Sequence, residues 1–176
     1  MNHVYSEPIY ILKITDKRGQ VLEENHISQK PVIDKENAYI ICDMLKGVLE
    51  PGGTGSHLKK IIGRNAAGKT GTTDEFQDAW FTGFTPRLSC SVWVGYDLNR
   101  NVNLTGGAIA GPIWANFMRE ASVSAPDEDF NRPVGIDIVN ICLDSGLVAT
   151  ESCPRTIEMA FYHGTEPEDI CYYHLS

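Results

Sequence analysis

The segment of the chain with the most reactive chemistry runs from Gly63 to Thr73. Residues 63–70 match the phosphate-binding pattern G-x-x-x-x-G-K-[ST] at every position. That pattern requires a helix directly after the lysine, because the helix N-terminus and the loop amides hold the phosphates. Here the lysine and its threonine are followed by Gly71 and Thr72, which are poor helix formers, and then by a second β-branched threonine. We therefore keep a nucleotide-binding loop at residues 63–70 as the less favoured alternative.

The lysine of this segment, Lys69, fits a second interpretation as the first residue of a K-T-G strand. Its ammonium group would stand beside the hydroxyl groups of Thr70 and Thr72, and both hydroxyls can donate to a carboxylate. Gly71 has no side chain, so a substrate backbone can approach the strand closely. A strand N–H can also donate to a developing oxyanion. The pattern thus predicts a strand that binds an anionic, peptide-like substrate.

The elements before this strand can be predicted from local patterns. Residues 8–22 indicate two short strands joined by a turn that ends at Gly19. Asp34 is a candidate helix N-cap, and apolar residues recur behind it at helical spacing until Pro51. A second short helix is expected over about 56–62.

Beyond Ala66 the hydrophobic period changes from that of a helix to that of a strand. Residues 79–85 and 89–96 predict an antiparallel hairpin, and their apolar side chains on both faces favour a sheet covered on two sides. A helix with Pro112 in its first turn should follow. Residues 122–133 are polar and acidic and predict a linker, after which we expect a strand over 136–143 and an irregular tail.

Several blocks in a fixed order, spread over nearly the whole chain, make the K-T-G interpretation specific. Together they resemble the transpeptidase domain of class A penicillin-binding proteins, which carry a glycosyltransferase domain and a membrane anchor further upstream. The blocks are residues 52–55, 67–73, 78–86, 92–97, 106–114 and 117–118, then Gly146, Cys153-Pro154, Phe161, 164–167 and Cys171. The resemblance implies an α+β chain, part of the penicillin-binding and serine β-lactamase-like fold, with an antiparallel sheet flanked by helices.

The resemblance also implies that the chain has two parts and that its transpeptidase fold is incomplete on the N-terminal side. It implies that residues 1–123 are the C-terminal part of a transpeptidase domain and that residues 124–176 form a C-terminal extension. In this family an S-x-x-K nucleophile motif and an S-x-N motif precede the K-T-G strand. Ser56-His57-Leu58-Lys59 satisfies S-x-x-K, but it lies too close to Lys69, and no S-x-N occurs in the sequence. We therefore interpret Ser56 as a surface or cap serine and expect this chain alone to be inactive.

The resemblance further implies a function for the complete protein. A serine would attack the D-Ala-D-Ala bond of a peptidoglycan stem peptide, and an amine would then take the acyl group; β-lactams would acylate the same serine. Lys69 would be a catalytic-site lysine, Thr70, Gly71 and Thr72 would bind the substrate, and no cofactor is implied. The protein would work at the extracytoplasmic face of the bacterial plasma membrane. An alternative is a non-catalytic interaction module with the same fold.

Composition limits the partners. The formal net charge of -8 argues against nucleic acid, which attracts basic surfaces. An incomplete sheet with an apolar face would favour a homodimer.

The five cysteines have no unique interpretation from the sequence. Cys153, His163, Cys171 and His174 were candidates for a zinc set, but their spacing matches no common finger. A disulfide between Cys153 and Cys171 is simpler and suits the extracytoplasmic address that the resemblance implies. Cys142 is the main rival for pairing, and free thiols are also open. We therefore expect one tail disulfide and no metal.

Overall fold

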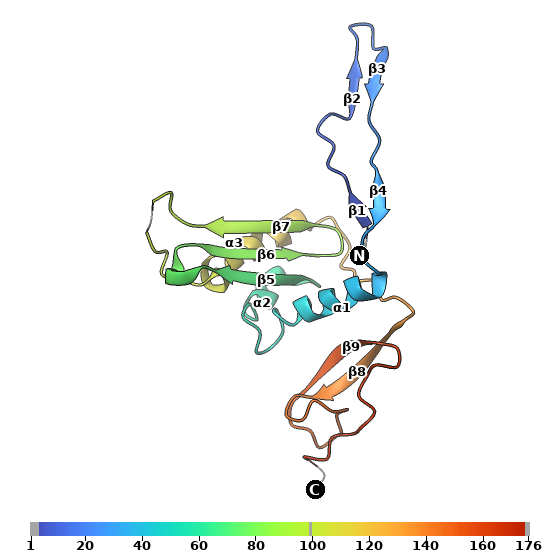
Figure 1. Ribbon diagram of the computed structural model, residues 1–176. Coiled ribbons are helices and arrows are strands. Elements are labelled where there is room, and N and C mark those ends of the chain that lie inside the picture. The colour runs from blue at the N-terminus through green and yellow to red at the C-terminus, as the bar shows by residue number, and fades with distance from the viewer. Residues whose placement is uncertain (1–3, 99, 175–176) are drawn as a thin grey trace.

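The computed structural model describes residues 4–98 and 100–174, so the outermost ends of the two expected parts, 1–3 and 175–176, lie outside the described residues. A three-stranded sheet stands at the centre of the molecule, an N-terminal arm extends from one side, and a C-terminal hairpin lies on the other (Figure 1). This mixture of helices and antiparallel sheets agrees with the expected α+β class.

The central sheet consists of β5 (Ala67–Thr72), β6 (Ala79–Phe84) and β7 (Ser89–Val94), all antiparallel and in that order. The predicted hairpin is therefore confirmed as β6 and β7, and the K-T-G residues lie in β5. The register pairs Lys69 with Thr82 and Gly71 with Trp80. Because side chains alternate between the faces of a strand, this register fixes which residues share a face with Lys69.

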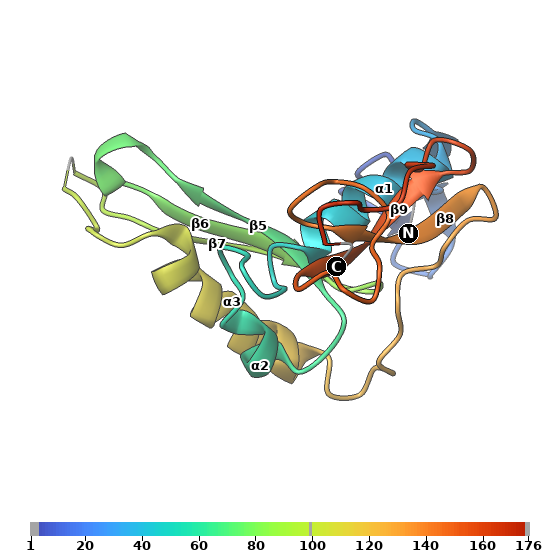
Figure 2. The same ribbon diagram turned by 90° about the horizontal axis from the view of Figure 1, so that it is seen from below.

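One face of the sheet carries the first hydrophobic core. The helices α2 (Leu58–Ile62) and α3 (Gly106–Ala121) lie on the same side of the sheet (Figure 2). Trp114 of α3 is fully buried against Phe81 of β6, with ring centroids 4.6 Å apart, and its indole N–H donates to the Gly83 carbonyl. Met118, Leu49 and Leu58 complete this core with smaller neighbours.

The opposite face of the sheet is open around Lys69 and the tryptophan pair, whereas the second hydrophobic core, described below, packs on its Ala67 and Phe84 end. Trp80 and Trp93 stand there with their ring centroids 6.3 Å apart, and their exposed fractions are 43% and 44%. The prediction of a sheet covered on both faces therefore holds at only one end of the second face. Helices α2 and α3 cover the first face, whereas on the second face α1 (Lys35–Lys46) and the C-terminal extension reach only the Ala67 and Phe84 end.

Helix α3 begins earlier than the sequence indicated, so Pro112 lies inside it rather than in its first turn. Thr105 is the N-cap, and its side-chain oxygen accepts a hydrogen bond from the Ala108 N–H. Pro112 itself cannot donate to a carbonyl one turn back, but its own carbonyl accepts from the Asn116 side chain at 2.8 Å. The helix starts with Gly106 and Gly107 although glycine is a poor helix former, and close packing explains this, as described below.

A second hydrophobic core joins α1 (Lys35–Lys46) to the start of β5 and to the C-terminal hairpin. Asp34 does occupy the N-cap position of α1, although its side chain makes no capping hydrogen bond. The helix ends at Lys46 and turns follow it, so the apolar periodicity toward Pro51 extended the predicted helix too far. The members of this core are Tyr39, Cys42, Ala67, Phe130, Ile136 and Ala160.

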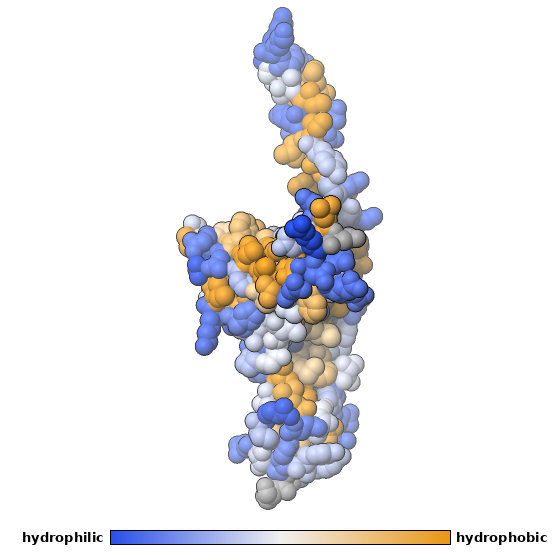
Figure 3. Space-filling view, turned by 90° about the vertical axis from the view of Figure 1, so that its left-hand side faces the viewer, coloured by the Kyte–Doolittle hydropathy of each residue, from blue (hydrophilic) through white to orange (hydrophobic). Residues whose placement is uncertain are grey.

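The N-terminal arm is formed by two short antiparallel ladders, β1 (Val4–Ser6) with β4 (Gln29–Pro31), and β2 (Lys13–Thr15) with β3 (Val21–Glu24). The predicted turn is present between β2 and β3, and Gly19 adopts a φ of 82° there. Apolar side chains are visible along the arm and on the body below it (Figure 3). Those exposed on the arm include Tyr10, Ile11, Leu12, Val21 and Leu22.

The C-terminal extension is more regular than expected. Strand β8 (Ile136–Cys142) pairs along its whole length with β9 (Thr156–Tyr162), which the sequence had suggested only as irregular tail. The linker before it is anchored to the body. The Arg87 guanidinium forms two hydrogen bonds with the Glu128 carboxylate, and Phe130 packs edge-on against Phe84. No helix in the described part of the chain is both long and apolar enough to cross a membrane.

Candidate functional site

Strand β5, which contains the K-T-G residues, is an outer strand of the central sheet among the described residues, because it pairs with β6 and not with β7. Alternation places Lys69 and Gly71 on the open face, together with Thr82, Ser91 and the tryptophan pair. Thr70 and Thr72 lie on the face that α3 covers. The four predicted site residues thus lie next to one another in β5, with the ammonium group on one face of the strand and the two hydroxyls on the other.

Lys69 is exposed, and its Nζ donates to the carbonyl of Thr70 at 2.9 Å. Beside it, the hydroxyls of Thr82 and Ser91 share a hydrogen bond of 2.9 Å. Among the described residues, no carboxylate forms an ion pair with Lys69, whereas several other lysines do have such partners. The ammonium group is therefore available to an anionic ligand on the open face.

Thr70 is held by the turn that precedes α2. Its hydroxyl shares a hydrogen bond of 3.2 Å with the hydroxyl of Thr54. This turn also contacts α3, because His57 Nε2 lies 3.0 Å from the Gly107 carbonyl oxygen. A Cβ atom on Gly107 would stand 2.7 Å from the Thr54 carbonyl oxygen, so only glycine allows this approach. Thr54 and His57 were not among the predicted site residues; the glycines flanking Thr54 were the available signal.

Thr72 connects the strand to the first residue of α3. Its side-chain oxygen accepts a hydrogen bond from the Gly106 N–H at 3.1 Å. Its hydroxyl proton is then free to be donated to a ligand. A Cβ atom on Gly106 would lie 2.1 Å from the Trp80 carbonyl oxygen and 2.4 Å from that of Gly71. The two glycines at the start of α3 therefore bring the positive end of the helix dipole beside the K-T-G strand.

The loop after the strand is strained and tightly bonded. Glu75 and Phe76 both adopt positive φ angles, 61° and 54°, which are uncommon for residues with side chains. Asp78 closes the loop: its backbone N–H donates to the Thr73 hydroxyl, and its carboxylate accepts from the Trp93 indole at 2.8 Å. Asp78 thus acts as a structural residue.

The other two motifs do not assemble into a site. Lys69 lies within a strand and is followed by further strand residues, so the helix that a phosphate-binding loop requires is missing from this place. Ser56 lies in a turn, and Lys59, the lysine of the S-x-x-K match, forms an ion pair of 2.5 Å with Glu50. A lysine held by a carboxylate is a poor base for activating a serine.

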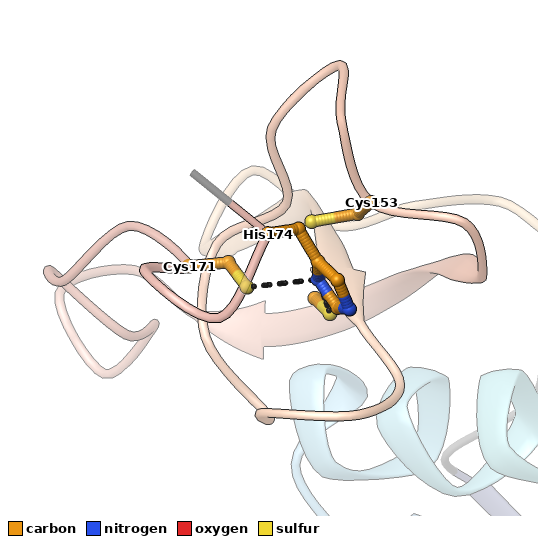
Figure 4. Close-up of side chains that lie close together, drawn as sticks. Cys153, Cys171 and His174 are labelled. Carbon is orange, nitrogen blue, oxygen red and sulfur yellow. Dashed lines mark hydrogen bonds between the residues drawn. The ribbon is translucent and has the colours of Figure 1, made fainter. Parts of the chain in front are cut away.

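The predicted disulfide partners lie together in the C-terminal extension, and all five cysteines of the chain carry free thiols in the structure. Figure 4 shows Cys153, Cys171 and His174 pointing toward one another. The sulfur of Cys142 lies with them, and the three sulfurs and a ring nitrogen of His174 are all within 4.8 Å of one another. His163, a member of the zinc set considered from the sequence, lies elsewhere and binds Asp137.

The thiols of this cluster differ in acidity. The Ser145 side chain, followed by His174, lowers the pKa of Cys171 to about 6. Burial opposes ionisation of Cys142, but hydrogen bonds from Ser145 and from the Asp144 backbone lower its pKa overall. The Thr150 hydroxyl favours the Cys153 thiolate, yet burial and the two neighbouring thiols raise the pKa of Cys153.

Comparison with known proteins gives the family. The family model described as the penicillin binding protein transpeptidase domain matches residues 2–119, and that described as the penicillin-binding protein 1A C-terminal domain matches residues 132–176. The chain therefore belongs to the penicillin-binding protein transpeptidase family. The class A resemblance noted from the motifs is confirmed.

The relatives include penicillin-binding protein 1A of Aquifex aeolicus (strain VF5), which is 40% identical over 167 residues that cover 94% of this chain and 23% of the relative. Penicillin-binding protein 2D of Bacillus subtilis (strain 168) is 34% identical, with coverage of 94% and 25%. The crystal structure of penicillin-binding protein 1A from Haemophilus influenzae superposes with a TM-score of 0.78 at 26% identity, over 94% of this chain and 30% of that one. The chain thus spans about a quarter of the length of these curated relatives.

Proposed function

We propose that this chain supplies the K-T-G substrate-binding strand of a peptidoglycan DD-transpeptidase that acts through a serine acyl-enzyme and is inhibited by β-lactams. The observation that supports this most is the arrangement around β5. An ammonium group that no described carboxylate pairs with, two threonine hydroxyls and an approachable glycine lie along one outer strand, with the N-terminus of α3 beside Thr72.

Each residue has a definable role in this proposal. The carboxylate of a D-Ala-D-Ala stem peptide or of a β-lactam lies along the edge of β5 that pairs with no described strand, where Lys69 attracts it from one face and Thr72 donates its hydroxyl proton to it from the other. Thr70, fixed by Thr54, holds the edge of the strand in place. Gly71 lets the substrate backbone lie against the strand, so that strand N–H groups can donate to the oxyanion of the tetrahedral intermediate.

The covalent step needs groups that the described residues do not place beside β5. The nucleophilic serine attacks the carbonyl carbon between the two D-alanines, its proton passes to a basic lysine, and the terminal D-alanine leaves with a proton on its amine. An amine of a second stem peptide then attacks the acyl-enzyme and restores the serine. In this proposal the serine and its lysine are supplied by residues outside this chain, and the complete protein acts at the extracytoplasmic face of the plasma membrane.

The first test uses the chain as it stands. Incubation with a fluorescent penicillin, followed by a denaturing gel, should give no labelled band at the mass of this chain, because Ser56 lacks a free basic lysine. A labelled band would contradict the assignment of the nucleophile to other residues. Repeating the experiment with Ser56→Ala would then show whether Ser56 is the acylated residue.

The second test uses the protein that contains this chain together with the coding sequence preceding it. Lys69→Ala removes one charge-assisted hydrogen bond to the substrate carboxylate, which is worth about 1.5–3 kcal/mol. The second-order rate of acylation by penicillin should therefore fall by about 10- to 100-fold. Lys60→Ala is the matched control, since Lys60 is exposed on α2 and the substitution removes the same charge. Equal rates for the two variants would contradict the role of Lys69.

A further inference from the structure

We infer that Cys142, Cys153, Cys171 and His174 form a structural zinc site in the C-terminal extension. The four ligand atoms lie within 4.8 Å of one another, although the residues come from three separate stretches of the chain. Three sulfurs and one imidazole nitrogen are a common ligand set for four-coordinate zinc. The proposed function gives this cluster no role.

The distances to the imidazole agree with zinc coordination. His174 Nδ1 lies 3.4 Å from the Cys171 sulfur and 3.6 Å from the Cys142 sulfur. With Zn–S and Zn–N bonds of about 2.3 and 2.0 Å, tetrahedral geometry places a sulfur and a nitrogen about 3.5 Å apart. The side chains are therefore already close to the positions that one central ion would require, and only small adjustments would complete the site.

The surroundings of the four side chains resemble an outer coordination shell. The other ring nitrogen of His174, Nε2, lies 3.4 Å from the carboxylate of Asp144, an arrangement that commonly orients a zinc-bound histidine. Asp144 is itself held by Arg155. The backbone N–H of Thr150 donates to the Cys153 sulfur at 3.3 Å and helps to fix the position of that sulfur. A disulfide would involve only two of the three cysteines. It would not explain why the third cysteine and His174 lie beside them, or why Asp144 contacts His174.

The extension also needs the stabilisation that a metal provides. It contains one hairpin, β8–β9, while the connections on either side of β9 are mostly irregular. They are held together mainly by single β-bridges of Val148 with Ile141 and with Ile170. Cys142 and Cys171 are fully buried at this point, so a metal there would take the place of a hydrophobic core. Small units of this kind commonly depend on a metal or on disulfides for folding.

The sequence alone favoured a disulfide because the spacing of the tail cysteines and histidines matches no common zinc finger and because a disulfide suits an extracytoplasmic address. The set considered from the sequence includes His163. In the structure His163 binds Asp137 instead, and the fourth member of the cluster is Cys142, at the end of β8. Cys171 and His174 are separated by two residues, which is the short spacing typical of paired zinc ligands.

The decisive experiment measures metal and thiols in the same purified chain. Elemental analysis should find one zinc per chain, and a denatured, chelator-treated sample without reductant should show five titratable thiols. Three thiols and no zinc would overturn the site in favour of a disulfide. Five thiols with no zinc, even after reconstitution with a zinc salt, would also overturn it, and so would stoichiometric iron in place of zinc.

Variants separate the two models further. Cys142→Ser should lose at least nine-tenths of the bound zinc, whereas a Cys153–Cys171 disulfide would be indifferent to it. Cys90→Ser is the control, because Cys90 lies on β7 away from the cluster, and it should retain one equivalent. Asp144→Asn should keep the coordination but weaken zinc affinity by about 10- to 100-fold. Should Cys142→Ser fail to fold, the cobalt-substituted wild-type chain still decides: a spectrum without tetrahedral thiolate bands would refute the site.

Discussion

Gly106 offers a direct test of how the K-T-G strand is positioned. In Gly106→Ala the new methyl group would stand 2.1 Å from the Trp80 carbonyl oxygen and 2.4 Å from the Gly71 carbonyl oxygen. Both are backbone atoms of paired strands, so no side-chain rotation can relieve the contact. The start of α3 would have to move away from the sheet by about 1 Å to restore ordinary contacts.

The cost of this substitution can be worked out from its parts. Overpacking of a well-packed site costs about 1–3 kcal/mol, and a backbone contact belongs at the upper end. The hydrogen bond from the Gly106 N–H to Thr72 would be lost as well, at about 1 kcal/mol. Replacing glycine returns up to about 1 kcal/mol through lower chain entropy. The free energy of unfolding should therefore fall by about 2–3 kcal/mol.

The assay is urea denaturation followed by tryptophan fluorescence, with Gly135→Ala as the matched control. At Gly135 the nearest atom to a new Cβ is the flexible Glu36 side chain at 3.3 Å, so the same change should cost much less. A loss below about 0.5 kcal/mol for Gly106→Ala would refute the close packing of α3 on the K-T-G strand. So would equal losses for the two variants.

Three further predictions address other parts of the molecule. Trp114→Ala should lower the free energy of unfolding by about 3–5 kcal/mol in the same denaturation assay, because the fully buried indole fills the first core; a loss under about 1 kcal/mol would contradict this. The hydrogen bond to Asp137 raises the pKa of His163, so its stabilising effect should be complete below about pH 6.5 and be lost as pH rises through the folded value. An NMR titration should show this raised midpoint, and Asp137→Asn should lower it by removing its largest cause, while the charge of Glu166 remains. Burial raises the pKa of Cys42 to about 12, so iodoacetamide should label partly exposed Cys90 well before Cys42 in the native chain; equal rates would be inconsistent with the buried thiol.

The sequence could predict elements whose signals are local. The hairpin of β6 and β7 follows from two β-rich runs around Pro86, and α1 follows from its periodicity behind Asp34. The K-T-G strand was placed correctly because glycine and β-branched residues follow Lys69 and disfavour a helix. In each case the competing structure is excluded by residues within a few positions of the element.

Features that depend on distant contacts could not be predicted in the same way. The start of α3 at two glycines makes sense only once the carbonyls of Gly71 and Trp80 are seen beside it. Likewise, β9 is defined by its pairing with β8, and its own alternation was too weak to indicate a strand. The cysteine cluster depends on how two irregular connections fold back over that hairpin. The spacing of the cysteines in the sequence therefore does not predict it.

Strand β5 takes part in both hydrophobic cores, and this links the two family-matched parts of the chain. Ala67, its first residue, packs with Ile136 and Ala160 of the extension, while Thr70 and Thr72 are bonded to the turn and helix of the first core. Phe130, in the linker between the two parts, packs on Phe84 of β6. The extension and the K-T-G strand should therefore unfold as one cooperative unit, so that anything stabilising the cysteine cluster would also slow local opening at the substrate-binding edge.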